Sequence, residues 1–441
     1  MRTSSTGTTI ANGRRRLAAT ARIVAVLVLS LGLVPWAAAG PADWTVLAYL
    51  SGDGSLDAAA VRYLHALAKA PPGQAVAIAV QIDRGRSPSA KAFGAAGATR
   101  WLVASRPGAR ERELVDLGWH HEVNMGDPES LFDFARWAVE RCPAKRYLLL
   151  IMGHGNGVRA LSADGESIPS SGVAYDATCG GDCLTTVELG QACARIRGLV
   201  GGRLNILAID ACFSATVELG CQVAPSVECL TGSPGLIYEP GVPWDHILGR
   251  LTALPDMSAP EAAKLIVESV RERQEAGGTP QGAYLAADLT RAPELEAVVG
   301  QLSGALVSRM DDLAPLITLG RSEARTTGLH AEMVDLSEFL RGLARAATSA
   351  GETRVAQLAA QAAGIGDGMV LARFAGDGNG GSGRVGWAVF FPPSLTAFPA
   401  DYLNTGRYAR EAGWGTLLAG YLGRLRSLVT PTARDARPAG A

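Results

Sequence analysis

A histidine and a cysteine follow two short apolar stretches of the chain in the same way. His154 comes directly after YLLLIMG, residues 147–153, and Cys212 comes directly after LNILAIDA, residues 204–211. A cysteine thiolate can attack a carbonyl carbon, and an imidazole beside it can give a proton to the departing group. Considered alone, each residue has a more common structural explanation: Cys212 as a buried thiol and His154 as a histidine at a strand end. Together they predict a catalytic pair.

The two apolar stretches have the features of buried parallel strands. Residues 147–152 and 204–209 are short runs of mostly branched apolar residues, bounded by polar residues or glycine. In an open α/β sheet, ligands bind beyond the carboxyl ends of such strands, so we expect His154 and Cys212 to face one crevice. A low thiol pKa needs a nearby cation or a helix N-terminus, and a helix predicted at 215–222 follows the cysteine.

The rest of the chain alternates between strand and helix patterns, which predicts a mainly parallel sheet with helices on both faces. Further strands are expected at residues 44–50, 75–82, 101–103, 227–231 and 385–391. One helix is expected to end near residue 68. Others are expected at 130–140, 186–196, 259–275 and over much of 291–363. Ser55 or Asp53 is expected to cap the first helix, and Asp127 is expected to be a turn or cap residue. The composition of residues 158–183 predicts a long surface loop.

The ordered set of motifs resembles the clostripain (C11) family of cysteine peptidases. Beside the strand–HG and strand–DAC units, similar segments are WTVLAYLSGDGSLD at 44–57, HEVNMGDPESLFDFARW at 121–137, YEPGVPWDHIL at 238–248, YLAADL at 284–289, VDLSEFL at 334–340 and GWAVFFP at 386–392. The resemblance covers residues from about 44 to about 421. It implies an α/β fold, a caspase-like α/β/α sandwich with a mostly parallel central sheet and an added C-terminal helical layer. It also implies a cysteine endopeptidase.

The resemblance implies roles for individual residues. Cys212 is expected to be the nucleophile and His154 to protonate the departing amine. Backbone N–H groups of Gly155 and Cys212 are expected to hold the oxyanion, because glycine lets the backbone approach closely. The acid two positions before the nucleophile, Asp210, is expected to line the S1 pocket and to favour Arg or Lys at P1. The alternative for Asp210 is a helix cap or a tie on the backbone turn.

A second acidic wall of the S1 pocket is expected at Glu239, with Asp245 close enough in the sequence to compete for this role. The chain departs from the family pattern nearby. SPG at residues 233–235 stands where an acidic or amide residue is expected after the serine, which bears on the basic P1 preference.

The N-terminus has the features of a signal peptide. Arginines at positions 14, 15, 16 and 22 precede an apolar run at 23–34, and small residues at 37–39 offer a cleavage site. The run is shorter than a spanning helix of about 20 residues, so an uncleaved anchor is the less favoured alternative. We expect a signal peptide at 1–39, a catalytic core at 40–250, a helical layer with a closing strand at 251–430 and a disordered tail at 431–441. Cleavage near Ala39 would leave a secreted or periplasmic chain.

Composition limits the partners and cofactors. A net charge of -1 gives no sign of a nucleic-acid partner, so we expect a protein or peptide substrate and no stable membrane association after signal removal. The sequence requires no cofactor and assigns no metal ligands. Adjacent His120 and His121 would face opposite sides of a strand, which disfavours a shared metal. The resembling family sometimes depends on calcium, and the loop at 176–182 could bind it.

The cysteine count is odd. Seven cysteines leave one thiol free if the others form disulfides in an oxidising compartment, and Cys212 is the candidate for the free one. Proximity in the sequence suggests Cys179 with Cys183 and Cys221 with Cys229, without fixing the pairing. A structural zinc site is disfavoured, because the chain has no CxxC pair.

Other functions stay open at this stage. A non-catalytic binding domain could keep the same scaffold, and an amide hydrolase or transpeptidase could use the same pair of residues. An enzyme that prefers basic P1 residues could also cut itself at Arg159, Arg195, Arg197 or Arg203. Arg197, which precedes a glycine, is expected to be the most accessible of these.

Overall fold

The structure is a computed structural model of the 441-residue chain. It describes residues 40–85, 96–105, 108–157, 172–278, 280–326, 331–376, 385–399, 402–404 and 406–429. The described residues from Ala42 onward belong to one compact unit. The expected signal peptide at 1–39, the candidate cleavage site Arg159 and the expected tail at 431–441 lie outside the described residues.

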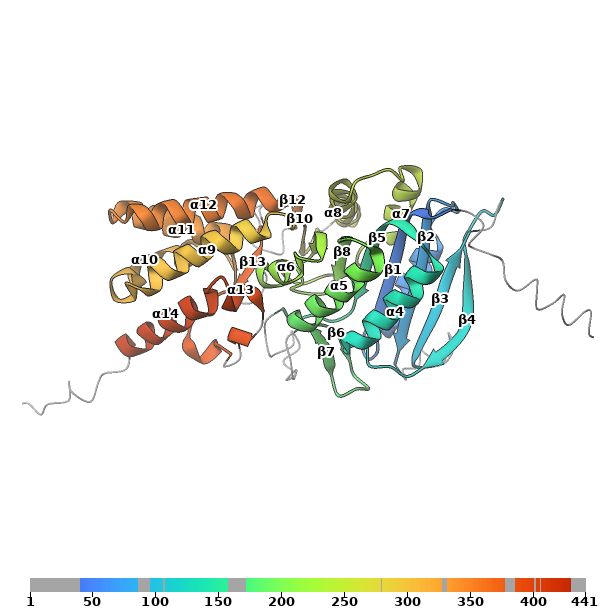
Figure 1. Ribbon diagram of the computed structural model, residues 1–441, viewed down its shortest axis with the longest axis horizontal. Helices are drawn as coiled ribbons and strands as arrows, with labels where there is room; N and C mark the ends of the chain where they lie inside the picture. Colours follow the sequence, from blue (N-terminus) through green and yellow to red (C-terminus); the bar gives the residue numbers. More distant parts are fainter. Residues whose placement is uncertain are drawn as a thin grey trace, which may run out of the picture. The chain divides into compact units, whose positions relative to one another are not determined.

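Among the described residues, nine strands form one sheet in the order β12-β10-β9-β8-β5-β1-β2-β3-β4 (Figure 1). The strands are β1 (Ala42–Gly52), β2 (Val76–Arg84), β3 (Ala98–Ala104), β4 (Glu113–His121), β5 (Ala144–Met152), β8 (Leu204–Asp210), β9 (Val227–Gly232), β10 (Ala283–Asp288) and β12 (Val370–Ala375). The central strands from β9 to β2 are parallel, and antiparallel pairs flank them at both edges. Parallel strands are buried on both faces and are therefore nearly continuous apolar runs, which made them recognisable in the sequence.

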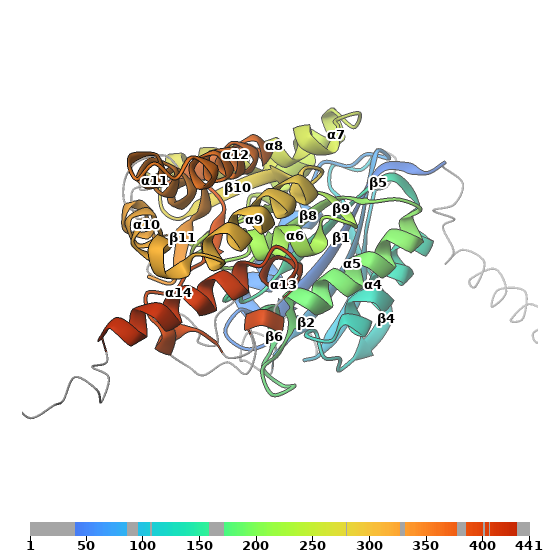
Figure 2. The same cartoon turned by 60° about the vertical axis from the view of Figure 1, so that its left-hand side comes forward.

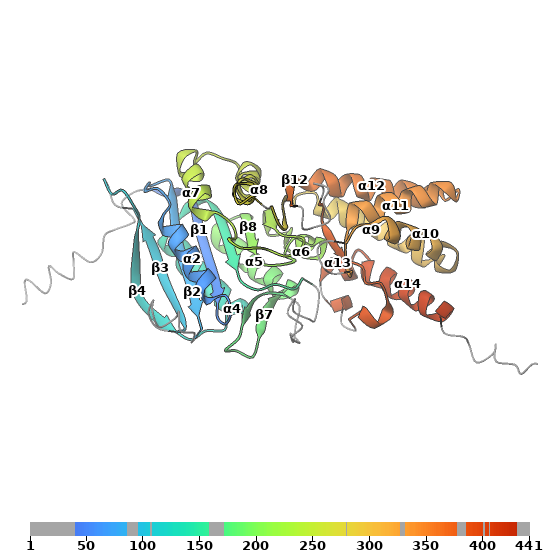
Figure 3. The ribbon, with the colours of Figure 1, turned by 180° about the vertical axis from the view of Figure 1, so that it is seen from behind.

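Helices cover both faces of this sheet (Figures 1 and 3). One face carries α2 (Asp57–Ala68), α7 (Trp244–Ala253) and α8 (Ala259–Ala276), and the other carries α4 (Pro128–Arg141), α5 (Thr186–Val200) and α6 (Val217–Val223). Side chains of β1 alternate between the two faces, as the geometry of a strand requires. Trp44 and Val46 belong to the core under α2, α7 and α8, whereas Tyr49 packs against Phe134 of α4 with ring centroids 5.8 Å apart. The predicted α/β/α sandwich is confirmed.

The helix caps follow the sequence in some places and not in others. Asp127 is the N-cap of α4, and its side chain accepts a 2.9 Å hydrogen bond from the Glu129 N–H, as expected. The N-cap of α2 is Leu56, so the expectation that Ser55 or Asp53 caps this helix is wrong. Both side chains are engaged with other parts of the molecule, described below.

Most of the helices after residue 290 form a separate layer (Figure 2). It contains α9 (Ala292–Val307), α10 (Met310–Glu323), α11 (Leu336–Ser349), α12 (Thr353–Met369), α13 (Arg407–Arg410) and α14 (Trp414–Val429). These helices pack mainly on one another, and α9 also contacts α6 beneath the sheet. Phe391 lies at their centre, edge-on to the rings of Phe339 and Trp414. No helix within the described residues is long and apolar enough to span a bilayer.

Two strands after residue 250 belong to the main sheet. β10 pairs with β9, and β12 closes this edge beyond β10. The main sheet therefore extends past residue 250, where a boundary between a core and a helical layer was expected. The strand expected at 385–391 is the shorter β13 (Ala388–Phe390), which pairs with β11 (Met333–Asp335) in a separate two-stranded sheet.

Candidate active site

His154 and Cys212 follow neighbouring parallel strands. β5 and β8 pair so that Met152 lies opposite Asp210, and the Gly153 N–H donates a 3.4 Å hydrogen bond to the Asp210 carbonyl. Just beyond this pair, both segments leave the sheet at the carboxyl ends of the strands. One segment carries the imidazole and the other carries the thiol. The structure therefore brings the two predicted strand ends together.

Both side chains line one open pocket with a volume of about 170 Å³. Asp210 and Glu239 line the same pocket, whose remaining walls come from α2, from the end of β5 and from residues 237–241. All four side chains predicted to act on a substrate are thus gathered in one cavity.

The cysteine lies on a sharp turn between β8 and α6. Phe213, the next residue, has a φ of 53°, a left-handed conformation that is uncommon for a residue with a Cβ atom and costs free energy. The Phe213 N–H donates a 2.8 Å hydrogen bond to the Gly235 carbonyl, which holds this turn in place. The Ile237 N–H points at the Cys212 Sγ from 3.4 Å. The turn therefore presents a partly exposed thiol to the pocket.

The helix after the cysteine begins later than predicted. α6 starts at Val217, and the hydroxyl of its N-cap, Thr216, accepts a hydrogen bond of 3.2 Å from the Leu219 N–H. The preceding residues form the turn instead of the first helical turn. Cys212 is therefore not next to a helix N-terminus. Asp210 does not cap this helix, so that alternative for its role is wrong.

His154 is exposed and is held by two other segments of the chain. Its Nε2 atom and the Ser55 Oγ, from the loop between β1 and α2, are hydrogen-bonded at 2.7 Å. Its carbonyl accepts a 3.0 Å hydrogen bond from the Ala174 N–H. Ala174 has a φ of 57°, so a second non-glycine residue in the left-handed region lies beside the predicted pair. Sequence reasoning missed the role of Ser55, for which the only signal was its place after a predicted strand end.

Gly155 packs directly against the backbone of the turn that carries Cys212. A Cβ atom on Gly155 would lie 2.5 Å from the Cys212 carbonyl oxygen and 2.9 Å from the Ala211 Cβ, so no larger residue fits without displacement. The adjacent bridge to residues 172–174 uses the carbonyl of His154 and the N–H of Asn156, rather than the N–H of Gly155. The two backbone N–H groups expected to hold an oxyanion thus belong to segments in close contact.

Asp210 is buried at the end of β8. Its Oδ2 accepts a 2.6 Å hydrogen bond from the Tyr63 hydroxyl and a longer one of 3.4 Å from the Trp244 Nε1–H. Its Oδ1 has no hydrogen-bond partner among the described residues. Burial raises the pKa of Asp210 from its usual 3.8 to about 7, although the two hydrogen bonds oppose this rise. The pocket is therefore lined by a buried carboxyl group with one oxygen that has no hydrogen-bond partner among the described residues.

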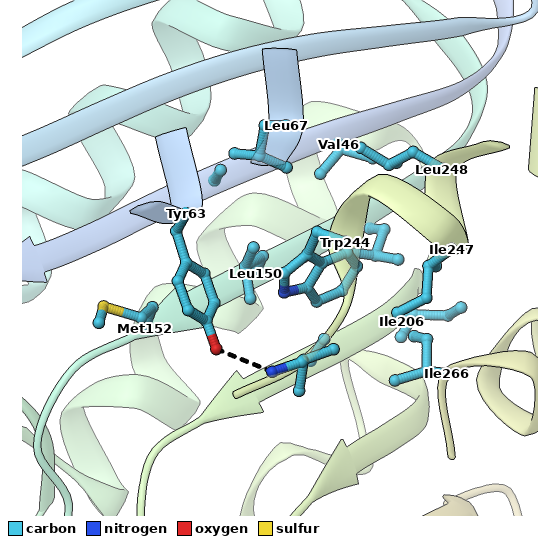
Figure 4. Close-up of a cluster of buried hydrophobic side chains, with 14 of the residues drawn as sticks. Val46, Tyr63, Leu67, Leu150, Met152, Ile206, Trp244, Ile247, Leu248 and Ile266 are labelled. Atoms are coloured by element: carbon cyan, nitrogen blue, oxygen red, sulfur yellow. Dashed lines mark hydrogen bonds between the residues drawn. The ribbon is translucent and has the colours of Figure 1, made fainter. Parts of the chain in front are cut away.

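Tyr63 holds this carboxylate in place. Its hydroxyl donates to Asp210 and accepts a hydrogen bond of 3.1 Å from the Val242 N–H, which is the dashed line in Figure 4. Figure 4 also shows Tyr63 and Trp244 side by side in the apolar core on this face of the sheet. Nothing in the sequence distinguishes Tyr63, because an aromatic residue on the buried side of a helix is an ordinary core residue.

The other predicted acids lie apart from Asp210. Glu239 has a side chain that is 69% exposed and forms an ion pair with Arg62 of α2, which puts it at the rim of the pocket. Asp245 lies on α7 and pairs with Arg273 at 3.2 Å.

The SPG segment at residues 233–235 supports the turn that carries Cys212. The Ser233 hydroxyl donates a 3.0 Å hydrogen bond to the same Gly235 carbonyl that accepts from Phe213. This departure from the family pattern thus holds the backbone in place, and neither Ser233 nor Gly235 lines the pocket.

All seven cysteines are free thiols in this structure, so the suggested disulfides are not present. Cys221 packs beneath the sheet near Glu296 and Arg407, whereas Cys229 belongs to the core on the opposite face. Cys183 is buried against Tyr175, whereas Cys179 is partly exposed in the turn before it.

Exposure separates Cys212 from most of the other thiols. Among the seven, only Cys179 and Cys212 are partly exposed. Burial raises the pKa of Cys142 and of Cys193 to about 12, which keeps these thiols protonated and unreactive at neutral pH. Cys212 is the partly exposed thiol that lies in the pocket with His154.

The structure also shows the surroundings of His120 and of the turn at 176–182. His120 is on the edge strand β4, half-exposed, and pairs with Asp116 at 3.1 Å. In the turn at 176–182, the Asp182 carboxylate accepts a hydrogen bond from the Asn124 amide at 2.6 Å.

Asp176 instead lies with two other buried acids, Asp53 and Asp83. Burial raises the pKa of Asp83 to about 8, and the carboxylates of Asp176, Glu122 and Asp53 add to this rise. Asp53 is therefore part of a buried acidic cluster and more than a turn residue.

Comparison with known proteins identifies the family. A family model described as the clostripain family, peptidase C11, matches residues 93–390. Clostripain from Hathewaya histolytica is 28% identical over 160 residues, which cover 33% of this chain and 28% of that protein. The aligned stretch thus spans less than a third of the curated relative.

Solved structures share the fold. A secreted C11 cysteine protease from Bacteroides thetaiotaomicron, in complex with an irreversible peptide inhibitor, aligns with a TM-score of 0.60 at 16% identity over 85% of this chain and 99% of that chain. An inactive zymogen C11 protease from Parabacteroides distasonis aligns with a TM-score of 0.58 at 15% identity over 87% of this chain and 98% of that chain. The family model covers well over half of the sequence. This chain belongs to the clostripain family of cysteine peptidases.

Proposed function

We propose that this chain is an exported cysteine endopeptidase that cleaves peptide bonds after Arg or Lys. One observation carries the proposal: a partly exposed thiol and a histidine line the same pocket as a buried carboxylate with an unpartnered oxygen. Membership of the clostripain family supports the reaction class.

In the first half of the reaction, the Cys212 thiolate attacks the carbonyl carbon of the scissile bond. The carbonyl oxygen becomes an oxyanion, for which the N–H groups of Gly155 and Cys212 are the proposed donors. His154 then gives its proton to the departing amine as the C–N bond breaks, leaving a thioester on Cys212.

In the second half, water replaces the amine. His154 takes a proton from a water molecule, whose oxygen attacks the thioester carbonyl. The C–S bond breaks, and the carboxylic acid product leaves a thiolate that can react again. No cofactor enters this sequence of steps.

The P1 preference rests on Asp210. A guanidinium or ammonium group that reaches the base of the pocket could pair with the Asp210 Oδ1, while Tyr63 and Trp244 keep the carboxylate in position. Charge-assisted hydrogen bonds of this kind are about twice as strong as neutral ones. Glu239 at the rim would act more weakly, because it is exposed and already paired with Arg62.

Export rests on the sequence of the N-terminus. The arginines, apolar run and small residues at 14–39 are typical of a signal peptide that directs a chain out of the cytoplasm. The structural relative from Bacteroides thetaiotaomicron is described as secreted, which fits this proposal.

A substrate panel tests the proposal. Fluorogenic peptides that differ only in Arg, Lys, Asn or Asp at P1 would be given to the purified mature protein, and kcat/KM would be measured for each. We expect efficient release with Arg or Lys and little with Asn or Asp. Turnover restricted to Asn or Asp would overturn the P1 assignment. No turnover of any peptide would favour a binding domain, and transfer to an added amine in preference to water would favour a transpeptidase.

A further inference from the structure

One segment that resembles the clostripain family takes no part in the pocket. GWAVFFP, residues 386–392, contains β13, which pairs with β11 outside the main sheet. None of its residues, all of which the structure describes, lines the pocket of Cys212. The segment nevertheless reaches the turn after the cysteine through Ala388, and the helix after that turn through Phe390. It therefore contacts the backbone that carries the thiol without entering the cavity.

The backbone after Cys212 is held by two separate parts of the chain. The first is the segment after β9, where the Ser233 carbonyl accepts a 2.9 Å hydrogen bond from the Ala215 N–H. The second is β13. Its Ala388 N–H donates a 3.3 Å hydrogen bond to the Ala215 carbonyl, and Thr216 forms an isolated parallel bridge with Ala388. The position of the turn therefore depends on β13 as well as on the main sheet.

Glu218, in the first turn of α6, joins this helix to the C-terminal part of the chain. The residue is 1% exposed. Its Oε1 accepts hydrogen bonds from the Phe390 N–H at 2.9 Å and from the Tyr402 hydroxyl at 2.8 Å. Phe390 ends β13, and Tyr402 begins the 3-10 helix η4 (Tyr402–Asn404). One side chain thus connects α6 to two segments that lie far from it in the sequence.

The two donors are themselves fixed in place. The Phe390 carbonyl accepts a 3.0 Å hydrogen bond from the Nε1–H of Trp414, at the start of α14. The rings of Phe390 and Tyr402 pack with their centroids 4.9 Å apart. Trp387 packs directly on α6, because a Cβ atom on Gly220 would lie 2.7 Å from its ring. A side chain bound to such a rigid framework can hold the helix, and the turn before it, in one place.

A carboxyl group in this position lowers stability. Burial raises the pKa of Glu218 above its usual range, although the hydrogen bonds from Phe390 and Tyr402 oppose this rise. Neither donor carries a positive charge that would offset an ionised carboxylate, and Oε2 has no hydrogen-bond partner among the described residues. An apolar side chain of similar size would avoid the unfavourable burial. Groups that reduce stability in this way are typical of functional regions.

We propose that Glu218 is a positioning residue of the peptidase, which fixes the turn carrying Cys212 by tying α6 to β13 and η4. The turn needs such support, because Phe213 within it has a left-handed φ of 53°. A shift of the turn would displace both the thiol and the Cys212 N–H, which is a proposed donor to the oxyanion. The effect on catalysis rests on the proposed function; the effect on the thiol does not.

Kinetics of two substitutions at one position test this role. Glu218→Met removes both hydrogen bonds at similar size, whereas Glu218→Gln keeps an amide oxygen that can accept them. In Glu218→Met, kcat for the best peptide should fall by about 10- to 100-fold, because a small displacement of a reacting group lowers the rate by such factors. KM should stay within about 3-fold, because Asp210 is not displaced. Glu218→Gln should recover kcat to within about 3-fold of the wild type.

The chain offers matched controls for both ends of the contact. The Gln222 Oε1 also accepts a backbone N–H, that of Arg407 at 3.0 Å, but from the last turn of α6. Gln222→Met should therefore keep wild-type kcat. Tyr402→Phe removes one of the two bonds to Glu218 and should lower kcat less than Glu218→Met does. Tyr408→Phe should have no effect, because this buried hydroxyl has no hydrogen-bond partner among the described residues.

The reactivity of the thiol gives a readout that does not depend on peptidase activity. The Ile237 N–H lies 3.4 Å from the Cys212 Sγ, and a hydrogen bond from it favours the thiolate. Displacement of the turn should weaken this bond. The rate at which iodoacetamide alkylates Cys212 would be followed by peptide mass spectrometry between about pH 5 and 9. The rise of this rate with pH should move to higher pH in Glu218→Met and stay unchanged in Gln222→Met.

The outcomes distinguish the two proposals. Wild-type kcat with an unshifted alkylation profile in Glu218→Met would overturn the positioning role. An equal loss in Gln222→Met, or no recovery in Glu218→Gln, would overturn it as well. If Glu218→Met does not fold, the smaller change Tyr402→Phe decides by the same two measurements. If the wild type cleaves no peptide, the proposed function fails, and the alkylation profiles alone decide whether Glu218 positions the thiol.

Discussion

At the scale of single residues, the central feature of the pocket is the buried carboxyl group of Asp210, with one oxygen hydrogen-bonded and the other without a partner among the described residues. Tyr63 and Trp244 donate to the Asp210 Oδ2, and no described residue bonds to Oδ1. A cationic side chain binds the ionised form of this group better than the neutral form, so P1 binding and ionisation of Asp210 favour each other. This relation gives two predictions of different kinds.

The first prediction concerns pH and selectivity. Because burial raises the pKa of Asp210 to about 7, the ratio of kcat/KM for an Arg substrate to that for a Gln substrate should rise by about 10-fold between pH 6 and 8. The ratio is the quantity to measure, because titration of the catalytic pair affects both substrates and cancels. In Asp210→Asn the ratio should be low and independent of pH. A flat ratio in the wild type would show that Asp210 does not bind the P1 side chain.

The second prediction concerns stability. The folded-state pKa of Asp210 lies above its unfolded-state value, so its favourable contribution to the free energy of unfolding is fully present below about pH 4 and lost as the pH rises through about 7. Asp210→Asn has no such loss. The variant should therefore gain stability relative to the wild type as the pH rises from 5 to 8, by about 3 kcal/mol.

Urea unfolding at the two pH values would measure this gain. Asp312→Asn is the control, because Asp312 is an exposed acid on α10 with a side chain that is 68% exposed. A constant difference between Asp210→Asn and the wild type would contradict the prediction. A variant that is more stable but less active would indicate that the buried acid is kept for its function.

His154, Cys212 and Asp210 could be predicted from the sequence, because each lies at or just after the end of an apolar strand. Tyr63 and Ser55 could not. Tyr63 is 147 positions from Asp210, and Ser55 is 99 positions from His154. Contacts over such separations depend on how strands are ordered in the sheet, which no local pattern records.

At the scale of elements, two turns and one hairpin determine the geometry of the site. The expected loop at 158–183 is, in its described part, a hairpin of β6 (Gly172–Asp176) and β7 (Asp182–Thr185), and β6 is fully buried. Its glycine and aspartate content indicated a loop, but burial beside the end of β1 stabilises a strand there. Tertiary packing can override such local preferences.

The candidate sites of self-cleavage also change at this scale. α5 continues to Val200, so Arg195 and Arg197 lie in a helix, and the expectation that Arg197 is in an accessible turn is wrong. A capping box of Thr185 and Glu188 starts this helix, and Gly201 in the left-handed conformation ends it. Cleavage at Arg197 would require local unfolding of its last turn.

The third prediction tests the contact between the two turns that carry His154 and Cys212. Gly155→Ala would put a Cβ atom 2.5 Å from the Cys212 carbonyl oxygen, so one of the two segments must move. A displacement of about 1 Å at a reacting group can cost about 10²-fold in rate, and kcat for the Arg substrate should fall by that order.

The control for this variant is Gly198→Ala. A Cβ atom at Gly198 meets nothing within 4 Å, and the residue lies within α5, where alanine is the more favourable residue. This variant should keep wild-type kcat and unfold at the same temperature or slightly above. Wild-type kcat in Gly155→Ala would show that close approach of these turns is not needed for catalysis.

At the scale of the whole molecule, the sheet could be predicted near its centre and not at its edges. β1, β2, β5, β8 and β9 are buried on both faces and therefore appear as apolar runs in the sequence. β12 is an edge strand with an exposed residue and follows α12 without a break, so its sequence did not distinguish it from helix. Its pairing with β10 brings residues from beyond 250 into the same sheet as the strands that lead to His154 and Cys212.

The fourth prediction tests the central claim, that Cys212 is the nucleophile of a pocket that selects a basic side chain. A peptide ketone with Arg at P1 and a good leaving group would be incubated with the mature protein, and the modified residue would be located by peptide mass spectrometry. Cys179 serves as an internal control, because it is the other partly exposed thiol. We expect one adduct, on Cys212, formed faster than with the matching Asp ketone and absent from Cys212→Ala. An adduct on Cys179 in place of Cys212, or continued peptide cleavage by Cys212→Ala, would contradict the account.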